Sequence, residues 1–167
     1  KGAPIKARRS GGKDQMWEAH PTESGFWKDS AVLVRHRVDK FSVEVNVTHK
    51  DPKEPMSGWA KTSEIGKSSR ENFTKKDGDK EPNWKEVRVI AEDPKAKLSI
   101  GSGYMHKLKM VDQNGGEREI IEYFILASDS LYRITVQYDK ESYQKYFARE
   151  GMQILNSIDR AKITKKK

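Results

Sequence analysis

Residues 117–138 read EREIIEYFILASDSLYRITVQY, and this stretch carries the strongest fold signal in the chain. Apolar side chains recur at alternate positions on both sides of Ser128-Asp129, which predicts two antiparallel strands joined by a short turn. Pairing Ala127 with Ser130 puts the regular apolar positions of both strands on one face. The pairs expected on that face are Ile125 with Tyr132, Tyr123 with Ile134 and Ile121 with Val136.

A series of strands leads up to this hairpin. Trp84 begins the series, and residues 98–110 form the next predicted strand, in which Gly101-Ser102-Gly103 suggests a bend or a bulge. Asn114-Gly115-Gly116 is a hairpin-turn signal placed directly before Glu117. The segment is therefore expected to form consecutive antiparallel strands.

An earlier hairpin is expected in residues 31–49, where valines alternate with other residues around Asp39-Lys40. A two-residue turn there sets Arg35 opposite Glu44 on the outer face. Asp-Lys lacks the glycine that the tightest turns prefer, so a wider turn in the same register is the alternative. The pairs expected on the apolar face are Val38 with Phe41, His36 with Val43, Val34 with Val45 and Val32 with Val47.

Two helices complete the predicted elements. Residues 57–75 read as a helix with Ser57 as N-cap and a thin apolar stripe, and residues 140–158 as a helix with Asp139 as N-cap. Gly151 interrupts the second stripe and would allow close packing on the sheet. That stripe comprises Tyr143, Tyr146, Phe147, Ile154, Leu155 and Ile158. The order of elements predicts an α+β fold, a mainly antiparallel sheet with helices packed on it.

The length of 167 residues favours a single domain. An apolar fraction of 34% and a charged fraction of 35% are on the polar side of the globular average, so part of the chain is expected to be unpacked. Residues 1–16 are predicted to be a flexible basic N-terminal arm, 17–159 a single α+β domain, and 160–167 a basic C-terminal tail. Residues 17–28 are expected to form a loop pinned by aromatic side chains.

The net charge of +8 is concentrated at the two ends. Residues 1–13 and 160–167 each hold five Lys or Arg residues and no acid, which leaves 23 basic and 25 acidic residues in 14–159, a net charge of −2. This near-neutral body disfavours nucleic acid as a partner. Binding of an anionic surface or a nucleic acid through the basic tails remains an alternative.

The sequence has no cysteine, which excludes disulfides, zinc–thiolate sites and thiol catalysis. No apolar run approaches the roughly 20 residues of a transmembrane helix, which leaves peripheral or lipid-anchored membrane association open. The first residue is Lys1 rather than Met, so we expect a processed or trimmed product whose targeting segment is outside this sequence.

No set of residues forms a recognisable catalytic, cofactor or metal site. His20, His36, His49 and His106 lack the spacings of zinc ligands, although His36 and His49 could meet in the fold. Gly101-Ser102-Gly103 is neither a nucleophile elbow nor a phosphate loop. A site of these kinds would have to form in the fold from residues that are distant in sequence.

Other candidate motifs have plain structural interpretations. Glu117-Arg118-Glu119 alternates in charge as an exposed strand does, rather than pairing two carboxylates for acid–base chemistry. The sequons Asn46-Val47-Thr48 and Asn72-Phe73-Thr74 are interpreted as chance occurrences, with Asn46 expected to face outward. Four tryptophans are expected in the core or at its edge, with a sugar- or peptide-binding groove as the alternative: Trp17, Trp27, Trp59 and Trp84.

The last third of the chain resembles PsbP-like domains. These domains end with a strand, a short turn, a strand with the pattern Tyr-x-(Ile, Leu or Val)-Thr, and a helix that closes on a Leu-Asn-Ser motif. Leu131-Tyr132-Arg133-Ile134-Thr135 and Ile154-Leu155-Asn156-Ser157-Ile158 occupy these positions, with Ile158 where an aromatic residue is more common. The specific match is confined to residues 119–158, within a broader similarity over residues 30–158.

The resemblance implies an α/β/α sandwich in a small extracytoplasmic protein of the periplasm or a lumen, secreted or lipid-anchored. It implies a non-catalytic binding or assembly-accessory role with a protein partner, and it transfers no catalytic, cofactor or metal residues. Binding residues, the identity of the partner and the oligomeric state are left open. The alternatives are a binder that uses its basic tails, and a small-ligand binder or enzyme whose site forms only in the fold.

Overall fold

The computed structural model describes residues 17–20, 30–36, 39–49, 61–78, 80–127 and 130–158. Within these ranges the chain forms one sheet of seven strands, in the order β1-β2-β3-β7-β6-β5-β4. Each strand is antiparallel to its neighbours. The strands are β1 (Trp17–His20), β2 (Ser30–His36), β3 (Phe41–His49), β4 (Trp84–Leu98), β5 (Gly101–Asp112), β6 (Glu117–Ala127) and β7 (Ser130–Tyr138).

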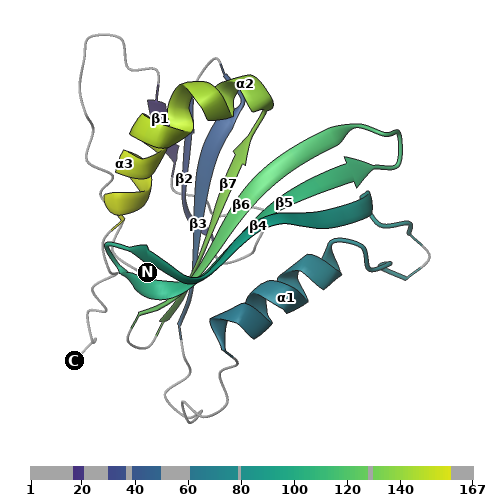
Figure 1. Ribbon diagram of the computed structural model, residues 1–167, viewed down its shortest axis with the longest axis horizontal. Helices are drawn as coiled ribbons and strands as arrows, with labels where there is room; N and C mark the ends of the chain where they lie inside the picture. Colours follow the sequence, from purple (N-terminus) through teal and green to yellow (C-terminus); the bar gives the residue numbers. More distant parts are fainter. Residues whose placement is uncertain are drawn as a thin grey trace.

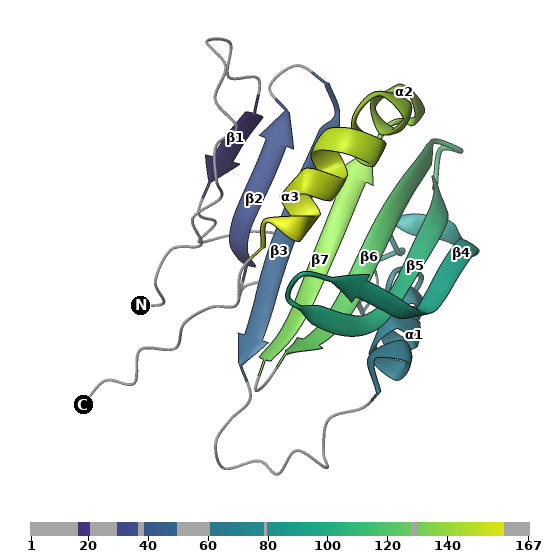
Figure 2. The same cartoon turned by 60° about the vertical axis from the view of Figure 1, so that its left-hand side comes forward.

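Helices lie on both faces of the sheet (Figure 1). One face carries α1 (Thr62–Asn72), and the other carries the consecutive segments α2 (Lys140–Ser142), η2 (Tyr143–Gly151) and α3 (Met152–Asn156). The consecutive segments cross over β3 and β7, whereas α1 packs on β5 and β6 (Figure 2). These three layers confirm the predicted α+β fold.

The β6–β7 hairpin has the register that its sequence predicts. Ala127 pairs with Ser130, and Tyr123 pairs with Ile134. Alternate side chains of both strands enter the larger apolar core, between the sheet and the segment from α2 to α3. Buried members of this core include Phe41, Val43, Val45, Ile121, Tyr123, Ile125, Tyr132, Ile134, Val136 and Leu155.

The β2–β3 hairpin keeps the predicted apolar face but has a different register. Val34 pairs with Val43 rather than with Val45, so the strands are shifted by two residues. A shift by two residues leaves every side chain on its predicted face, because side chains alternate along a strand. The predicted pairing of Arg35 with Glu44 is therefore wrong.

The connection between β2 and β3 explains this register. Strand β2 ends at His36 and β3 begins at Phe41, whereas a two-residue turn at Asp39-Lys40 was predicted; Val38 of the predicted pair with Phe41 lies outside the described residues. The His36 Nδ1 atom accepts a hydrogen bond from the backbone N–H of Asp39 at 3.0 Å. The sequence lacks the glycine of a tight turn, and the imidazole stabilises a wider connection instead.

The predicted strand 98–110 is wrong at its beginning. Strand β4 extends to Leu98, and β5 begins at Gly101. A Cβ atom at Gly103 would lie only 1.9 Å from the backbone oxygen of Phe124 in β6. The glycines therefore allow a close approach of two backbones near the start of β5.

The C-terminal helical segment begins as predicted. The Asp139 carboxylate accepts a hydrogen bond from the backbone N–H of Ser142 at 2.8 Å, as an N-cap residue does. The segment then continues as the π-helix η2 and ends as α3. A Cβ atom at Gly151 would lie 2.9 Å from Cζ of Phe41, so glycine allows the predicted close packing on the sheet.

Helix α1 is shorter than predicted, because it begins at Thr62. The predicted N-cap, Ser57, lies outside the described residues. Gly66 and Ser69 are the buried residues of α1, and a Cβ atom at Gly66 would lie 2.5 Å from the Tyr104 ring. The thin apolar stripe thus belongs to a helix that meets the sheet through small side chains.

The N-terminal part of the fold differs from the prediction in one respect. Trp17–His20 forms the edge strand β1, which pairs with β2, where a loop was predicted. The rest of that predicted loop, the predicted arm 1–16 and the predicted tail 160–167 lie outside the described residues. In the part of the chain that the structure describes, no helix is long and apolar enough to cross a membrane.

Candidate functional site

The face of the sheet under α1 carries a buried group of charged side chains. Alternation along β6 sends Ile121 and Tyr123 into the larger core and turns Glu122 to the opposite face. His106 of β5 pairs with Glu122 across the sheet, and Arg133 reaches the same carboxylate from β7. Two strand registers thus bring an acid, an imidazole and a guanidinium together.

We call Ser69, His106, Glu122 and Arg133 the charged cluster. Nε2 of His106 donates a hydrogen bond to Oε2 of Glu122 at 2.8 Å, and Nε of Arg133 donates to Oε1 at 2.9 Å. The Ser69 hydroxyl donates to Glu122 at 3.3 Å and accepts from Arg133 at 2.6 Å. Through Ser69, the cluster ties α1 to β6 and β7.

The carboxyl group of Glu122 is held in its ionised form although the side chain is fully buried. Burial alone would raise its pKa, but the hydrogen bond from His106 and the charge of Arg133 outweigh burial, so the pKa of Glu122 lies below its ordinary value. A buried carboxylate of this kind is stable only while its partners remain in place.

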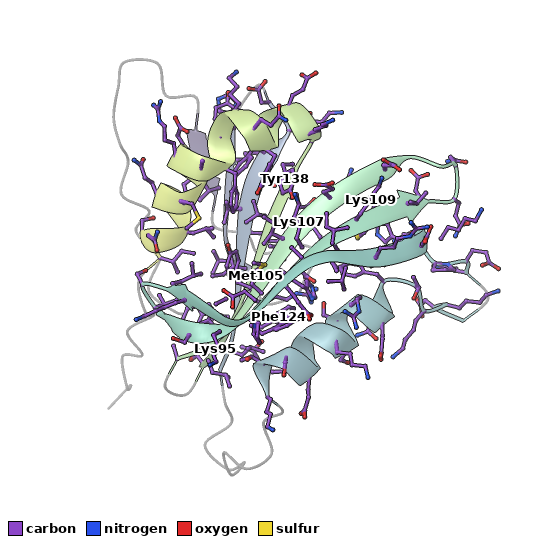
Figure 3. The ribbon with its side chains drawn as sticks, in the orientation of Figure 1. Lys95, Met105, Lys107, Lys109, Phe124 and Tyr138 are labelled. Carbon is purple, nitrogen blue, oxygen red and sulfur yellow. The ribbon has the colours of Figure 1, made fainter. Side chains whose placement is uncertain are left out.

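Two buried polar atoms beside these hydrogen bonds have no partner within the described residues. One is Nδ1 of His106, whose ring lies 5.5 Å, centroid to centroid, from both Tyr104 and Phe124. The other is Oγ1 of Thr135, which pairs with Glu122 in the β6–β7 register. In Figure 3, Phe124 is labelled on the α1 side of the sheet and Tyr138 on the side of α2.

A cavity of about 100 Å³, which we call the inner cavity, lies against the charged cluster. Glu122 and Arg133 of the cluster line it, together with the hydroxyl-bearing Thr135. Phe73 and Trp84 add aromatic surface. The remaining lining residues are Glu44, Met110, Arg118, Ile120 and Gln137.

A larger depression of about 460 Å³, the outer groove, lies between the end of α1 and the segment that leads into β4. Ser69, Phe73 and Trp84 line it. Because Phe73 and Trp84 also line the inner cavity, the two spaces are neighbours. The other lining residues are Asn72, Lys75, Asp77, Lys80, Glu81, Pro82 and Asn83, in which two lysines balance two acids.

The charged cluster contains a serine, a histidine and an acid, but not in the arrangement of a serine nucleophile. The Ser69 hydroxyl is hydrogen-bonded to the Glu122 carboxylate and the Arg133 guanidinium, and the His106 imidazole is hydrogen-bonded to the same carboxylate rather than to the hydroxyl. A serine nucleophile gives its proton to an adjacent base, and a carboxylate with a lowered pKa is a weak base. The cluster offers fixed hydrogen-bond donors and acceptors beside a cavity.

The structure separates the histidines that the sequence singled out. The His36 ring packs against Tyr146, with 4.6 Å between ring centroids. His49 ends β3, at the far end of the hairpin from His36, so these two residues do not meet. His106 lies in the charged cluster on the α1 side of the sheet, and His20 lies in β1. Among the described residues, no three His, Cys, Asp or Glu side chains gather as metal ligands.

The two short motifs considered for chemistry lie in strands. Gly101-Ser102-Gly103 begins β5. Glu117-Arg118-Glu119 begins β6, where the carboxylate of Glu117 lies 2.7 Å from the Lys109 ammonium and that of Glu119 lies 3.0 Å from Lys107. These partly exposed acids pair with lysines of β5, as the alternating charges predict.

The structure describes two of the four tryptophans and both asparagines of the sequons. Trp84 is half-buried, lines both the outer groove and the inner cavity, and has the Arg118 guanidinium 5.7 Å above its ring. Trp17 lies in β1, whereas Trp27 and Trp59 are outside the described residues. Asn46 lies on the predicted face of β3, opposite to the larger core, but it is only 4% exposed, so its predicted exposure to solvent is wrong.

The sequence analysis did not single out Glu122, which is buried. Glu44, expected on an outer face, is buried as well. The sequence does contain a signal for Glu122. The turns on either side of β6 set registers that align His106, Glu122 and Thr135 across three strands. What the sequence does not show is that α1 covers this row.

No family model and no curated protein sequence matches the chain. Solved structures do match. The chain is similar to cyanobacterial PsbP from Synechocystis sp. PCC 6803, with a TM-score of 0.61 and 8% sequence identity over 89% of this chain and 83% of that chain. It is also similar to a Pseudomonas aeruginosa protein of unknown function, with a TM-score of 0.50 and 9% identity over 96% of this chain and 99% of that one.

A third match is the Ran-binding protein Mog1p of Saccharomyces cerevisiae, with 12% identity over 86% of this chain and 83% of that chain. Its TM-score of 0.45 is too low to establish a shared fold. At 8% identity, the similarity to cyanobacterial PsbP is one of fold. It agrees with the strand–turn–strand–helix motifs that end at Ile158. The chain has the fold of a PsbP-like domain.

Proposed function

We propose that this protein is a non-catalytic binding or assembly-accessory domain that acts outside the cytoplasm and docks a protein partner in the outer groove. The observation that carries the proposal is the outer groove itself, a depression of about 460 Å³ whose wall is fixed to the sheet by the charged cluster. The PsbP-like fold and the sequence resemblance support the accessory role and the compartment.

The lining of the outer groove favours a protein partner. Its charges balance, with Lys75 and Lys80 against Asp77 and Glu81, so the groove has no excess of positive charge to attract a polyanion. Aromatic surface with scattered charges and amides is typical of the mixed composition of protein–protein interfaces.

The attachment of α1 to the sheet preorganises the outer groove for binding. Ser69 is hydrogen-bonded to both Glu122 and Arg133, and Gly66 lets the helix approach the Tyr104 ring closely. A surface that is already ordered loses less conformational entropy when a partner binds, so more of the contact energy becomes affinity.

Site-specific photo-crosslinking in cells that make the protein tests the docking surface. A photoreactive residue replaces Asn72, which is exposed and lines the outer groove, in the tagged full chain. The matched control replaces Gln144, which is exposed in η2 on the opposite side of the sheet. We expect one protein crosslinked from position 72 and not from position 144, and we expect Asn83→Arg, which crowds the groove, to remove that product.

Two results count against the docking surface. Equal crosslinking from both positions would indicate contact without a defined site. A product from position 72 that persists with Asn83→Arg would place the contact outside the groove.

The compartment has its own test. We expect the protein made in its native cells to fractionate with the periplasm, a lumen or the medium, and detergent extraction then separates a secreted form from a lipid-anchored one. Recovery in the cytoplasmic fraction would overturn the extracytoplasmic assignment and leave the docking surface to be judged by crosslinking.

A further inference from the structure

Thr135 carries a hydroxyl group that the fold does not use. Its Oγ1 atom has no hydrogen-bond partner in the described part of the structure, the residue is 7% exposed, and its side chain lines the inner cavity. A buried hydroxyl without a partner costs stability, because it loses water and gains no new bond. Valine has nearly the same shape without this cost, so packing does not explain the hydroxyl.

The charged groups around Thr135 are balanced in sign. Arg118 and Arg133 line the inner cavity together with Glu44 and Glu122. A ligand group with a net charge would lose its hydration without meeting a net opposite charge. A hydroxyl or a carboxamide both donates and accepts hydrogen bonds, so it suits a lining that offers both.

The size of the inner cavity suits a single side chain. Its volume of about 100 Å³ is that of a few water molecules and is well below the roughly 300–1,000 Å³ of typical small-molecule sites. Phe73 and Trp84 line both the inner cavity and the outer groove. A segment lying in the outer groove could therefore place one side chain in the inner cavity.

We propose that the inner cavity receives one uncharged polar side chain, a hydroxyl or a carboxamide, from the partner that docks in the outer groove, and that Thr135 Oγ1 is its hydrogen-bond partner. This inference rests on the proposed function and adds the chemistry of the docking segment. Side chains that fill a pocket near the centre of an interface commonly dominate its affinity, so Thr135 would determine specificity.

Titration of the isolated full chain with small probes tests the chemistry directly. The neutral probes are N-acetylserinamide and acetamide, and the charged probes are sodium acetate and methylammonium chloride. The readouts are the NMR signals of the Thr135 methyl group and the Trp84 indole N–H. We expect saturable shifts with the neutral probes only.

Variants separate the hydroxyl from the shape of the cavity. With Thr135→Val, the saturable Trp84 shift should be lost or require at least tenfold more probe, and Thr135→Ser should keep it. Thr48→Val, an exposed position in β3, is the matched control and should behave as wild type. Equal or tighter binding of a charged probe, an unchanged response of Thr135→Val, or no saturable shift with any probe would each overturn the proposal.

Stability distinguishes a binding role from a structural one. Because the hydroxyl has no partner, the Thr135→Val protein should unfold at an equal or higher denaturant concentration than wild type. A large drop in the unfolding midpoint would show that the hydroxyl supports the fold, and the inference would then be wrong.

The probe titration and the crosslinking experiment fail separately. Probe binding without a crosslink at position 72 would keep the chemistry of the cavity and reject the protein partner. A crosslink without probe binding would keep the partner and reject the inner cavity as an anchor site. Tighter binding of glucose than of N-acetylserinamide would reject the protein segment in favour of a saccharide.

Discussion

The His106 imidazole lies 2.8 Å from the Glu122 carboxylate, with both side chains completely buried between α1 and the sheet. Arg133 binds the other oxygen of the same carboxylate. The ionised acid is therefore enclosed by donors on two strands, and the helix above it depends on this pairing through Ser69. The stability of the α1 face should follow the charge of Glu122.

Glu122→Gln should destabilise the protein by about 3–5 kcal/mol at neutral pH, because it removes the negative charge from the buried ion pair with Arg133. Urea unfolding followed by circular dichroism measures the loss. Glu117→Gln is the matched control, since its exposed pair with Lys109 should contribute about 1 kcal/mol or less. Equal effects of the two substitutions would contradict the role of the buried pair.

The same pair predicts the acid limit of stability. The folded-state pKa of Glu122 is lowered from 4.5. The contribution of its charge to the unfolding free energy is therefore fully present above about pH 4.5 and is lost as the pH falls through the lower folded-state pKa. The difference in unfolding free energy between wild type and Glu122→Gln should therefore be largest near pH 7 and should shrink at pH 3. A difference that stays constant over this range would show that the carboxylate is not stabilised by its charge.

Gly66→Ala should destabilise the protein, although alanine favours an isolated helix by about 1 kcal/mol over glycine. The new Cβ atom would lie 2.5 Å from the buried Tyr104 ring, and overpacking of this kind costs about 1–3 kcal/mol. Lys67→Ala, at the next and exposed position, should change stability little. Tyr104→Leu should reduce the cost of Gly66→Ala, which a double-mutant cycle by urea unfolding measures. A Gly66→Ala protein more stable than wild type would mean that α1 packs differently.

The faces of the strands could be predicted from the sequence, whereas the registers could be predicted only where a turn is well specified. Alternation sets the face of a strand, and it is plain in both hairpins. The β6–β7 register follows from a short connection between Ala127 and Ser130. The β2–β3 register depends on His36 binding the Asp39 backbone, a contact that no local pattern records.

The candidate site was harder to predict because it depends on which residues α1 covers. Glu122 follows the alternation of β6, and nothing in its immediate sequence distinguishes a solvated acid from a buried one. Its burial follows from the approach of α1 through Gly66 and Ser69, two small residues that leave only a weak helical stripe. The inner cavity and the outer groove exist only after this helix is placed.

Removal of residues 1–13 and 160–167 tests the alternative that the basic ends carry the function. These segments hold all of the excess positive charge, so their removal should abolish any steeply salt-dependent binding to DNA or to anionic vesicles. If the outer groove is the binding surface, the crosslink from position 72 should persist in the shortened protein, with an unfolding midpoint close to that of wild type.

The control keeps both ends and replaces their ten basic residues with glutamine, which separates charge from length. Loss of the crosslink in both proteins would assign binding to the charge of the ends. Its loss in the shortened protein alone would indicate that these segments form part of the docking surface.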